Sequence, residues 1–239
     1  MWKPRFHYRS RKLDRVPSQI FKLLVLAFIF SDIEIVAALA TILVVAYFLG
    51  TYWKHRTLGK YAHWFEERFS RQAKVKYASF GHAGLRIKCL MNSSSEGFRE
   101  LEFALTLGAR ENLIYYPYRI VTKDFDKLNC WATLTSPVRF QVEITRQKKK
   151  MKLTWETAGT EEVKIPGLSE LGYSVYSTGS DFTKELVKRS GVVSRLKELD
   201  SVESLALQEE PPRLYLVARL RQDELPKLVD LISLMGRSI

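Results

Sequence analysis

The sequence predicts an α+β protein: a single transmembrane helix followed by a mostly antiparallel sheet domain with C-terminal helices. Three observations predict it: a long uncharged apolar run before residue 54, several strand-like segments after residue 75, and capped helical segments near the C-terminus. The chain of 239 residues, 46% hydrophobic and 27% charged, has the composition of a globular protein. That length accommodates one domain of ordinary size and an accessory segment.

The apolar run predicts a membrane-spanning helix over residues 31–53. After Glu34 it continues for about 19 residues without an ionisable side chain, the length needed to cross about 30 Å of hydrocarbon. Ser31 can cap the helix, with Glu34 three residues later. The alternatives are a buried core helix, which rarely needs so long an uncharged run, and a cleaved signal peptide, for which no cleavage site follows.

Four further segments complete the predicted organisation. Residues 1–18 form a basic N-terminal tail, and residues 19–30 are apolar but short, which indicates an interfacial or re-entrant segment. A second crossing by residues 19–30 is the alternative. Residues 54–74 are expected to form a basic juxtamembrane helix and residues 75–239 a cytosolic α+β domain.

The end of the apolar run has the composition of a membrane interface. Aromatic and cationic side chains gather there, and we assign membrane-interface roles to Tyr52, Trp53, Lys54, Arg56 and Trp64. Cations flank both ends of the run, so charge counting alone leaves the orientation open. The net charge of +12 indicates an anionic partner, either lipid headgroups or nucleic acid.

Seven segments after residue 74 read as strands separated by turn residues. They are residues 75–81, 85–92, 99–108, 116–122, 128–135, 138–146 and 150–157. In the sixth, Arg139, Gln141 and Glu143 alternate with Phe140, Val142 and Ile144, which is the period-two polarity of a strand.

The rest of the chain predicts helices around one more strand pair. A helix over residues 180–190 is capped by Ser180 or Asp181 and closed by Gly191, and a second helix begins at Val192. Residues 202–208 and 213–220 are strands, and an amphipathic helix follows, with Asp223 as its cap.

The sequence contains no recognisable catalytic, metal or cofactor motif. The four histidines lack metal-ligand spacing, no HExxH or CxxC occurs, and the glycines lack the context of a phosphate-binding loop. Cys89 and Cys130 lie in strand-like segments and are interpreted as small buried hydrophobes, with a disulfide as the alternative. We therefore expect a protein that is not an enzyme and has no cofactor.

The segment RQKKKMK is the strongest local concentration of charge. Its cations, for which we predict contact with anionic lipid or RNA, are Arg146, Lys148, Lys149, Lys150 and Lys152. A solubilising hairpin loop is the alternative. Without interleaved aromatic residues, any RNA contact would be with the backbone.

Three stretches resemble the calumin family, the coiled-coil-bearing subunit of the PAT complex of the multipass translocon. YFLGTYWKHRTLGKYAHWFEERFS, residues 47–70, is similar to the membrane exit and juxtamembrane helix of that family, with Ala62, Trp64 and Phe65 at comparable places. LKELDSVESLALQEEPPRLYLVARL and DELPKLVDLISLM are similar to its short helix, strand, acidic proline-containing link, apolar strand and closing helix. The acidic lumenal region and the coiled coil of the family are missing, so the chain resembles a short relative.

The resemblance implies a function, partners and a location. The function would be non-enzymatic assistance in the insertion or folding of multipass membrane proteins. The partners would be a Sec-type translocon with its small membrane subunits, the ribosome through its RNA backbone, the membrane and client transmembrane helices. The domain would be cytosolic, in a prokaryotic (for example archaeal) cell membrane or alternatively the endoplasmic reticulum membrane. The alternative function is a membrane-anchored domain that binds anionic lipid or another protein.

Overall fold

The computed structural model describes residues 32–81, 84–92, 97–108, 126–146 and 159–239, and the chain divides into two units, residues 1–46 and 47–239. The helices are α2 (Asp32–Phe69), α4 (Pro166–Glu170), α5 (Ser180–Ser190), α6 (Val192–Glu198) and α7 (Leu225–Ser238). The strands are β1 (Ala73–Phe80), β2 (Gly84–Met91), β3 (Phe98–Thr106), β4 (Lys127–Leu134), β5 (Val142–Arg146), β6 (Glu161–Glu162), β7 (Tyr173–Ser177), β8 (Val202–Gln208) and β9 (Arg213–Arg219).

Helix α2 contains the predicted membrane-spanning run. It is the one helix in the described part of the chain that is long and apolar enough to cross a membrane, and its most apolar window is not buried in the protein. Such a helix could anchor the protein in a membrane. The predicted spanning and juxtamembrane helices form one continuous helix, which ends at Phe69 and not at residue 74. The helix is shorter than predicted because Ala73 and Lys74 instead pair with Met91 and Leu90 in the first hairpin.

The later turns of α2 belong to the second unit, where they pack against its sheet. Leu58, Tyr61, Phe65 and Phe69 are buried, as expected from their helical spacing. The Phe65 ring lies 4.6 Å from the Phe103 ring of β3, centroid to centroid. These turns are therefore part of the core of the domain.

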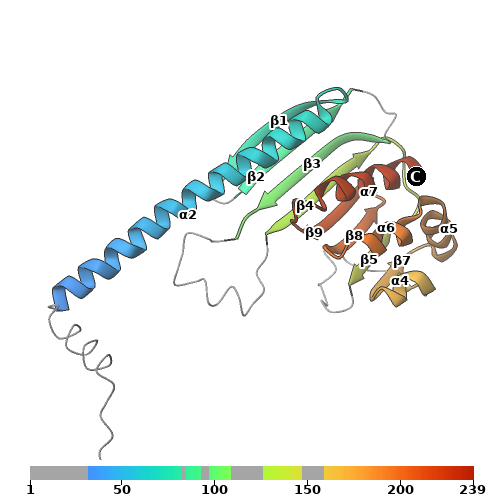
Figure 1. The fold of residues 1–239 in the computed structure, drawn as a ribbon. Helices are drawn as coiled ribbons and strands as arrows, with labels where there is room; N and C mark the ends of the chain where they lie inside the picture. The colour runs from blue at the N-terminus through green and yellow to red at the C-terminus, as the bar shows by residue number, and fades with distance from the viewer. Residues whose placement is uncertain (1–31, 82–83, 93–96, 109–125, 147–158) are drawn as a thin grey trace, which may run out of the picture. The chain divides into compact units, whose positions relative to one another are not determined.

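The nine strands form one antiparallel sheet in the order β1-β2-β3-β4-β9-β8-β5-β7-β6, which confirms the predicted α+β class (Figure 1). One face, the helix-covered face, carries residues such as Ile87, Phe103, Cys130 and Leu216, which are buried. The helix α7 lies on this face, and a side chain at Gly236 would overlap the ring of Phe98. The absence of a side chain at Gly236 thus permits close packing of α7 on the sheet.

The strand predictions are right for most of the described sheet and wrong at two places. Only Val142–Arg146 of the predicted strand 138–146 forms, and Glu143, a charged residue of that alternation, is only 6% exposed. It is buried because β5 is an interior strand, paired on both sides with β7 and β8. The strands β6 and β7 were not predicted. The predicted strands 116–122 and 150–157 and the segment 19–30 lie outside the described residues.

The C-terminal helices occur where predicted, but their N-terminal caps differ. Gly191 closes α5 in the left-handed conformation with φ of 60°, as expected. The cap of α5 is Gly179 and that of α7 is Glu224, and neither makes a side-chain cap hydrogen bond. Cys89 and Cys130 are free and buried, in agreement with the hydrophobic interpretation.

Candidate anion-binding site

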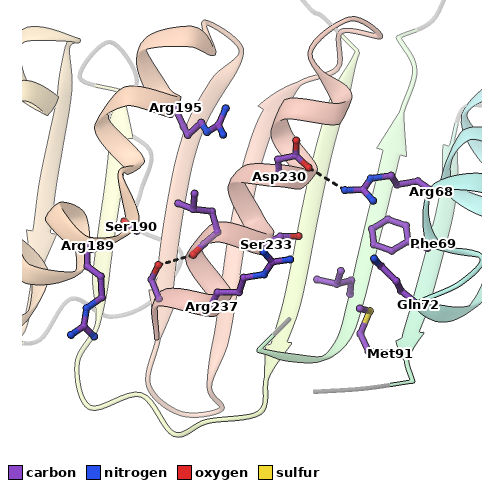
Figure 2. A pocket seen from close by; sticks show the side chains of 13 residues that line it. Arg68, Phe69, Gln72, Met91, Arg189, Ser190, Arg195, Asp230, Ser233 and Arg237 are labelled. Atoms are coloured by element: carbon purple, nitrogen blue, oxygen red, sulfur yellow. Dashed lines mark hydrogen bonds and ion pairs between the residues drawn. The ribbon is translucent and has the colours of Figure 1, made fainter. Parts of the chain in front are cut away.

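A pocket of about 410 Å³ on the helical side of the domain gathers four arginines. Arg68 comes from α2, Arg189 from α5, Arg195 from α6 and Arg237 from α7. We call this the arginine pocket, and Figure 2 shows its lining. Segments far apart in the sequence therefore place guanidinium groups around one cavity.

The wall formed by α7 follows from helical spacing. Asp230, Ser233 and Arg237 recur at intervals of three and four residues, which puts them on one side of the helix, away from its buried residues. From the opposite wall, Arg68 in the last turn of α2 points toward Asp230, and their charged groups lie 3.2 Å apart (Figure 2). Arg68 and Arg237 thus flank the only carboxylate among the lining residues.

Apolar residues support the pocket near the sheet. Phe69 and Leu101 are buried in the core, and Met91 packs against it. Gln72, Ser190 and Ser233 add uncharged polar side chains to the lining. The pocket therefore combines a rigid apolar base with hydrogen-bonding groups, the usual composition of a small-molecule site.

The ion pairs of Arg189 and Arg195 are exposed and long. Arg189 lies 3.5 Å from Glu185 and Arg195 lies 3.9 Å from Glu198, and the side chains in both pairs are at least 42% exposed. Such pairs contribute roughly 0–1 kcal/mol each, so an incoming anion can replace them at little cost. With four guanidinium groups and one carboxylate, the lining favours an anionic ligand.

Helix polarity supplies an alternative reason for these arginines. Each lies in the last turn of its helix, where a cation offsets the partial negative charge of the helix C-terminus. An arginine in the last turn can be read from the sequence, but by itself it indicates only a favourable helix end, because such residues are common at the C-terminus of any helix. The convergence of all four on one pocket is tertiary information.

The predicted cation cluster is only partly visible. The guanidinium of Arg146 pairs with Asp200 at 2.7 Å and lies 5.4 Å from the centre of the Tyr173 ring. Arg146 is thus held against the domain through these partners. Lys148, Lys149, Lys150 and Lys152 lie outside the described residues.

The predicted membrane-interface residues separate into exposed and packed side chains. Tyr52, Trp53 and Arg56 are exposed, as that role requires. Lys54 is only 1% exposed, because its position shares the buried stripe of Leu58. Trp64 is partly buried and packs against the core beside Phe65, with ring centroids 5.0 Å apart.

No group of three or more His, Cys, Asp or Glu side chains suited to a metal ion occurs among the residues that the structure describes.

The known proteins offer little that resembles this chain. No protein-family model and no curated protein matches the chain. A solved structure with a related arrangement is the mycobacterial trehalose monomycolate transport factor A, TtfA, with a TM-score of 0.38 and 9% identity over 70% of this chain and 71% of that chain. A similarity of this size carries no argument about function.

Proposed function

We propose that this protein is a membrane-anchored, non-enzymatic binding protein whose domain takes up an anionic ligand, bearing a phosphate or carboxylate group, in the arginine pocket. The observation that carries the proposal is the convergence of Arg68, Arg189, Arg195 and Arg237 on one cavity. The apolar run of α2 supplies the anchor. Membrane attachment and anion binding are thus assigned to different parts of the chain.

The chemistry of the guanidinium group supports an oxyanion as the ligand. Its planar fork matches two oxygens of a phosphate or carboxylate, and charge-assisted hydrogen bonds of this kind are about twice as strong as neutral ones. The pocket is concave and partly apolar, so a bound anion would be less screened there than on a flat surface. Selectivity for a particular anion would depend on Gln72, Ser190 and Ser233.

Binding of sn-glycerol 3-phosphate to the full chain in a neutral detergent tests the proposal. Titration calorimetry of the wild type should show binding that weakens as salt is added. The variant Arg237→Gln should bind about tenfold more weakly or worse, because a hydrogen bond to a charged group contributes roughly 1.5–3 kcal/mol.

The matched control is Arg213→Gln, since Arg213 is an exposed arginine at the start of β9 that does not line the pocket. This variant should bind as the wild type does. Absence of binding to the wild type, or an equal loss in both variants, would contradict a specific role for the arginine pocket.

The translocon hypothesis remains a more specific proposal for the same membrane-anchored protein. It rests on the resemblance to the calumin family and includes a cytosolic domain that contacts the ribosome, the translocon and client helices. Salt-sensitive co-purification with ribosomes or translocon subunits would support it. Solubilised protein that associates with neither would count against it and leave the anion-binding proposal intact.

A further inference from the structure

A second pocket, of about 360 Å³, adjoins the arginine pocket and has a different character. Its lining includes the apolar side chains Val138, Phe140, Phe182, Leu186 and Ile239, and we call it the apolar pocket. Arg189 and Ser238 line both pockets. The two cavities are therefore neighbours that share part of a wall.

Helix α5 connects the two cavities. Phe182, Leu186 and Arg189 follow one another at intervals of four and three residues, so they lie along one side of the helix. The first two line the apolar pocket, and Arg189 stands at the junction. Along this side of the helix, apolar surface gives way to positive charge.

An exposed aromatic pair marks the apolar pocket. Phe140 and Phe182 stack with ring centroids 5.8 Å apart and an angle of 15° between their planes. A side chain at Gly179 would come within 3.2 Å of Phe140 and 3.4 Å of Phe182, so this glycine leaves the rings room to meet. Phe182 is 57% exposed, and among the described residues after β1 it is the one large hydrophobic side chain exposed to this degree.

We propose that the two pockets together bind an anionic amphiphile, with its charged head in the arginine pocket and its hydrocarbon chain in the apolar pocket; this inference rests on the proposed function. The shared wall makes one molecule with both parts a better fit than two separate ligands. The charged groups of the apolar pocket are Arg139, Arg189 and Glu185. Apart from Arg189 at the junction, these are one cation and one carboxylate, so the pocket has no positive excess of its own for a second anionic group, whereas an uncharged chain can cover the exposed ring of Phe182.

Three probes with a common glycerol unit distinguish binding of the charged head from binding of the hydrocarbon chain. They are sn-glycerol 3-phosphate, a lysophosphatidate and a monoacylglycerol, and the two acylated probes carry a diazirine near the end of the same chain. The full chain is studied in phosphatidylcholine nanodiscs, and cross-linked peptides are identified by mass spectrometry. Labelling of the α2 run is background from lipid, so only peptides of the domain are scored.

The lysophosphatidate is expected to label peptides that contain residues 137–140 or 182–186, and the monoacylglycerol to label them at least tenfold less. The Phe182→Ala variant should bind lysophosphatidate about tenfold more weakly and bind glycerol 3-phosphate normally, because it removes apolar contact but no charge. The matched control is Phe80→Ala, which removes an exposed phenylalanine on β1 outside both pockets.

The outcomes distinguish the two proposals. Glycerol 3-phosphate binding that depends on Arg237, without labelling at the apolar pocket, would overturn the amphiphile inference and preserve the proposed function. Equal labelling by lysophosphatidate and monoacylglycerol would overturn the inference, since the phosphate head would then contribute nothing to binding. If none of the probes bound the domain, both proposals would fail.

Discussion

The two faces of the central sheet differ in how their side chains are used. On the helix-covered face, Phe103 is fully buried against the rings of Phe65 and Phe69. On the second face, Glu102 and Glu100, one and three residues before Phe103 in the same strand, form ion pairs with Arg86 and Lys88 of β2. Successive residues of one strand thus serve the core and a charged surface.

This difference shows what alternation in a strand does and does not determine. A period of two assigns neighbouring residues to opposite faces, but the helices decide which face becomes the core. The second face is not uniformly polar, because Glu143 and Thr145 on β5 are buried there and an oxygen of each has no hydrogen-bond partner. Substitutions on the two faces test the distinction.

The largest effect is expected on the helix-covered face. Phe103→Ala would leave a cavity against Phe65 and Phe69 and should lower the free energy of unfolding by about 3–5 kcal/mol. Denaturant unfolding of the full chain in detergent measures it. Thr106→Ala, an exposed position on the second face of the same strand, should change stability by less than about 0.5 kcal/mol. Similar losses in both variants would argue against the assigned faces.

A smaller, pH-dependent effect is expected at Glu143. Burial raises the pKa of this carboxyl above the ordinary value of 4.5. As pH rises through 4.5, the unfolded chain loses this proton first, so the contribution of Glu143 to stability is present below 4.5 and is lost as pH passes the folded-state pKa. The variant Glu143→Gln should not show this loss of stability with rising pH, because its side chain does not titrate.

Thermal unfolding of wild type and Glu143→Gln between pH 4 and 8 provides the measurement. The difference in Tm should shift in favour of the variant as pH rises, whatever the offset caused by the amide itself. A difference that is independent of pH would show that Glu143 has the same pKa in both states.

The smallest effect is expected for the ion pair of Lys88 and Glu100, whose charged atoms lie 2.7 Å apart on the second face. Both side chains are partly exposed, so their coupling energy should be about 0.2–1 kcal/mol and should decrease with salt. A double-mutant cycle with Lys88→Met and Glu100→Gln measures it. A coupling well above this range would indicate that the second face is shielded from solvent.

The sequence predicted strands that alternate in polarity or stand between turn residues, and missed β6 and β7, which lack a hydrophobic signal. β8 was predicted at its observed bounds, since VESLALQ stands between evident turn residues. β7, with the sequence YSVYS, carries serine and tyrosine on both faces and presents no hydrophobic period. Its pairing with β5 compensates for that weak local signal, and pairing between distant segments cannot be read from a local window.

Two of the predicted site residues have contacts that their neighbours in the sequence did not indicate. Lys54 looked like part of a cationic belt beside Arg56, but the helical period carries it to the buried side of α2. Arg146 begins the predicted cation cluster, and its guanidinium also pairs with Asp200, 54 residues away. Each side chain was assigned from its neighbours in the chain, whereas its contacts come from elsewhere.

The sequence by itself determined the apolar run of α2, the α+β class and most of the element bounds, because these depend on local composition and on periods of two and 3.6 residues. Only the tertiary structure decided which side chains converge. Arg68, Arg189, Arg195 and Arg237 each have a local explanation at a helix end, and they form one pocket only because the sheet brings four helix ends together. The physical reason is that charge at a helix terminus is a local property, whereas a binding site depends on distances between segments remote in sequence.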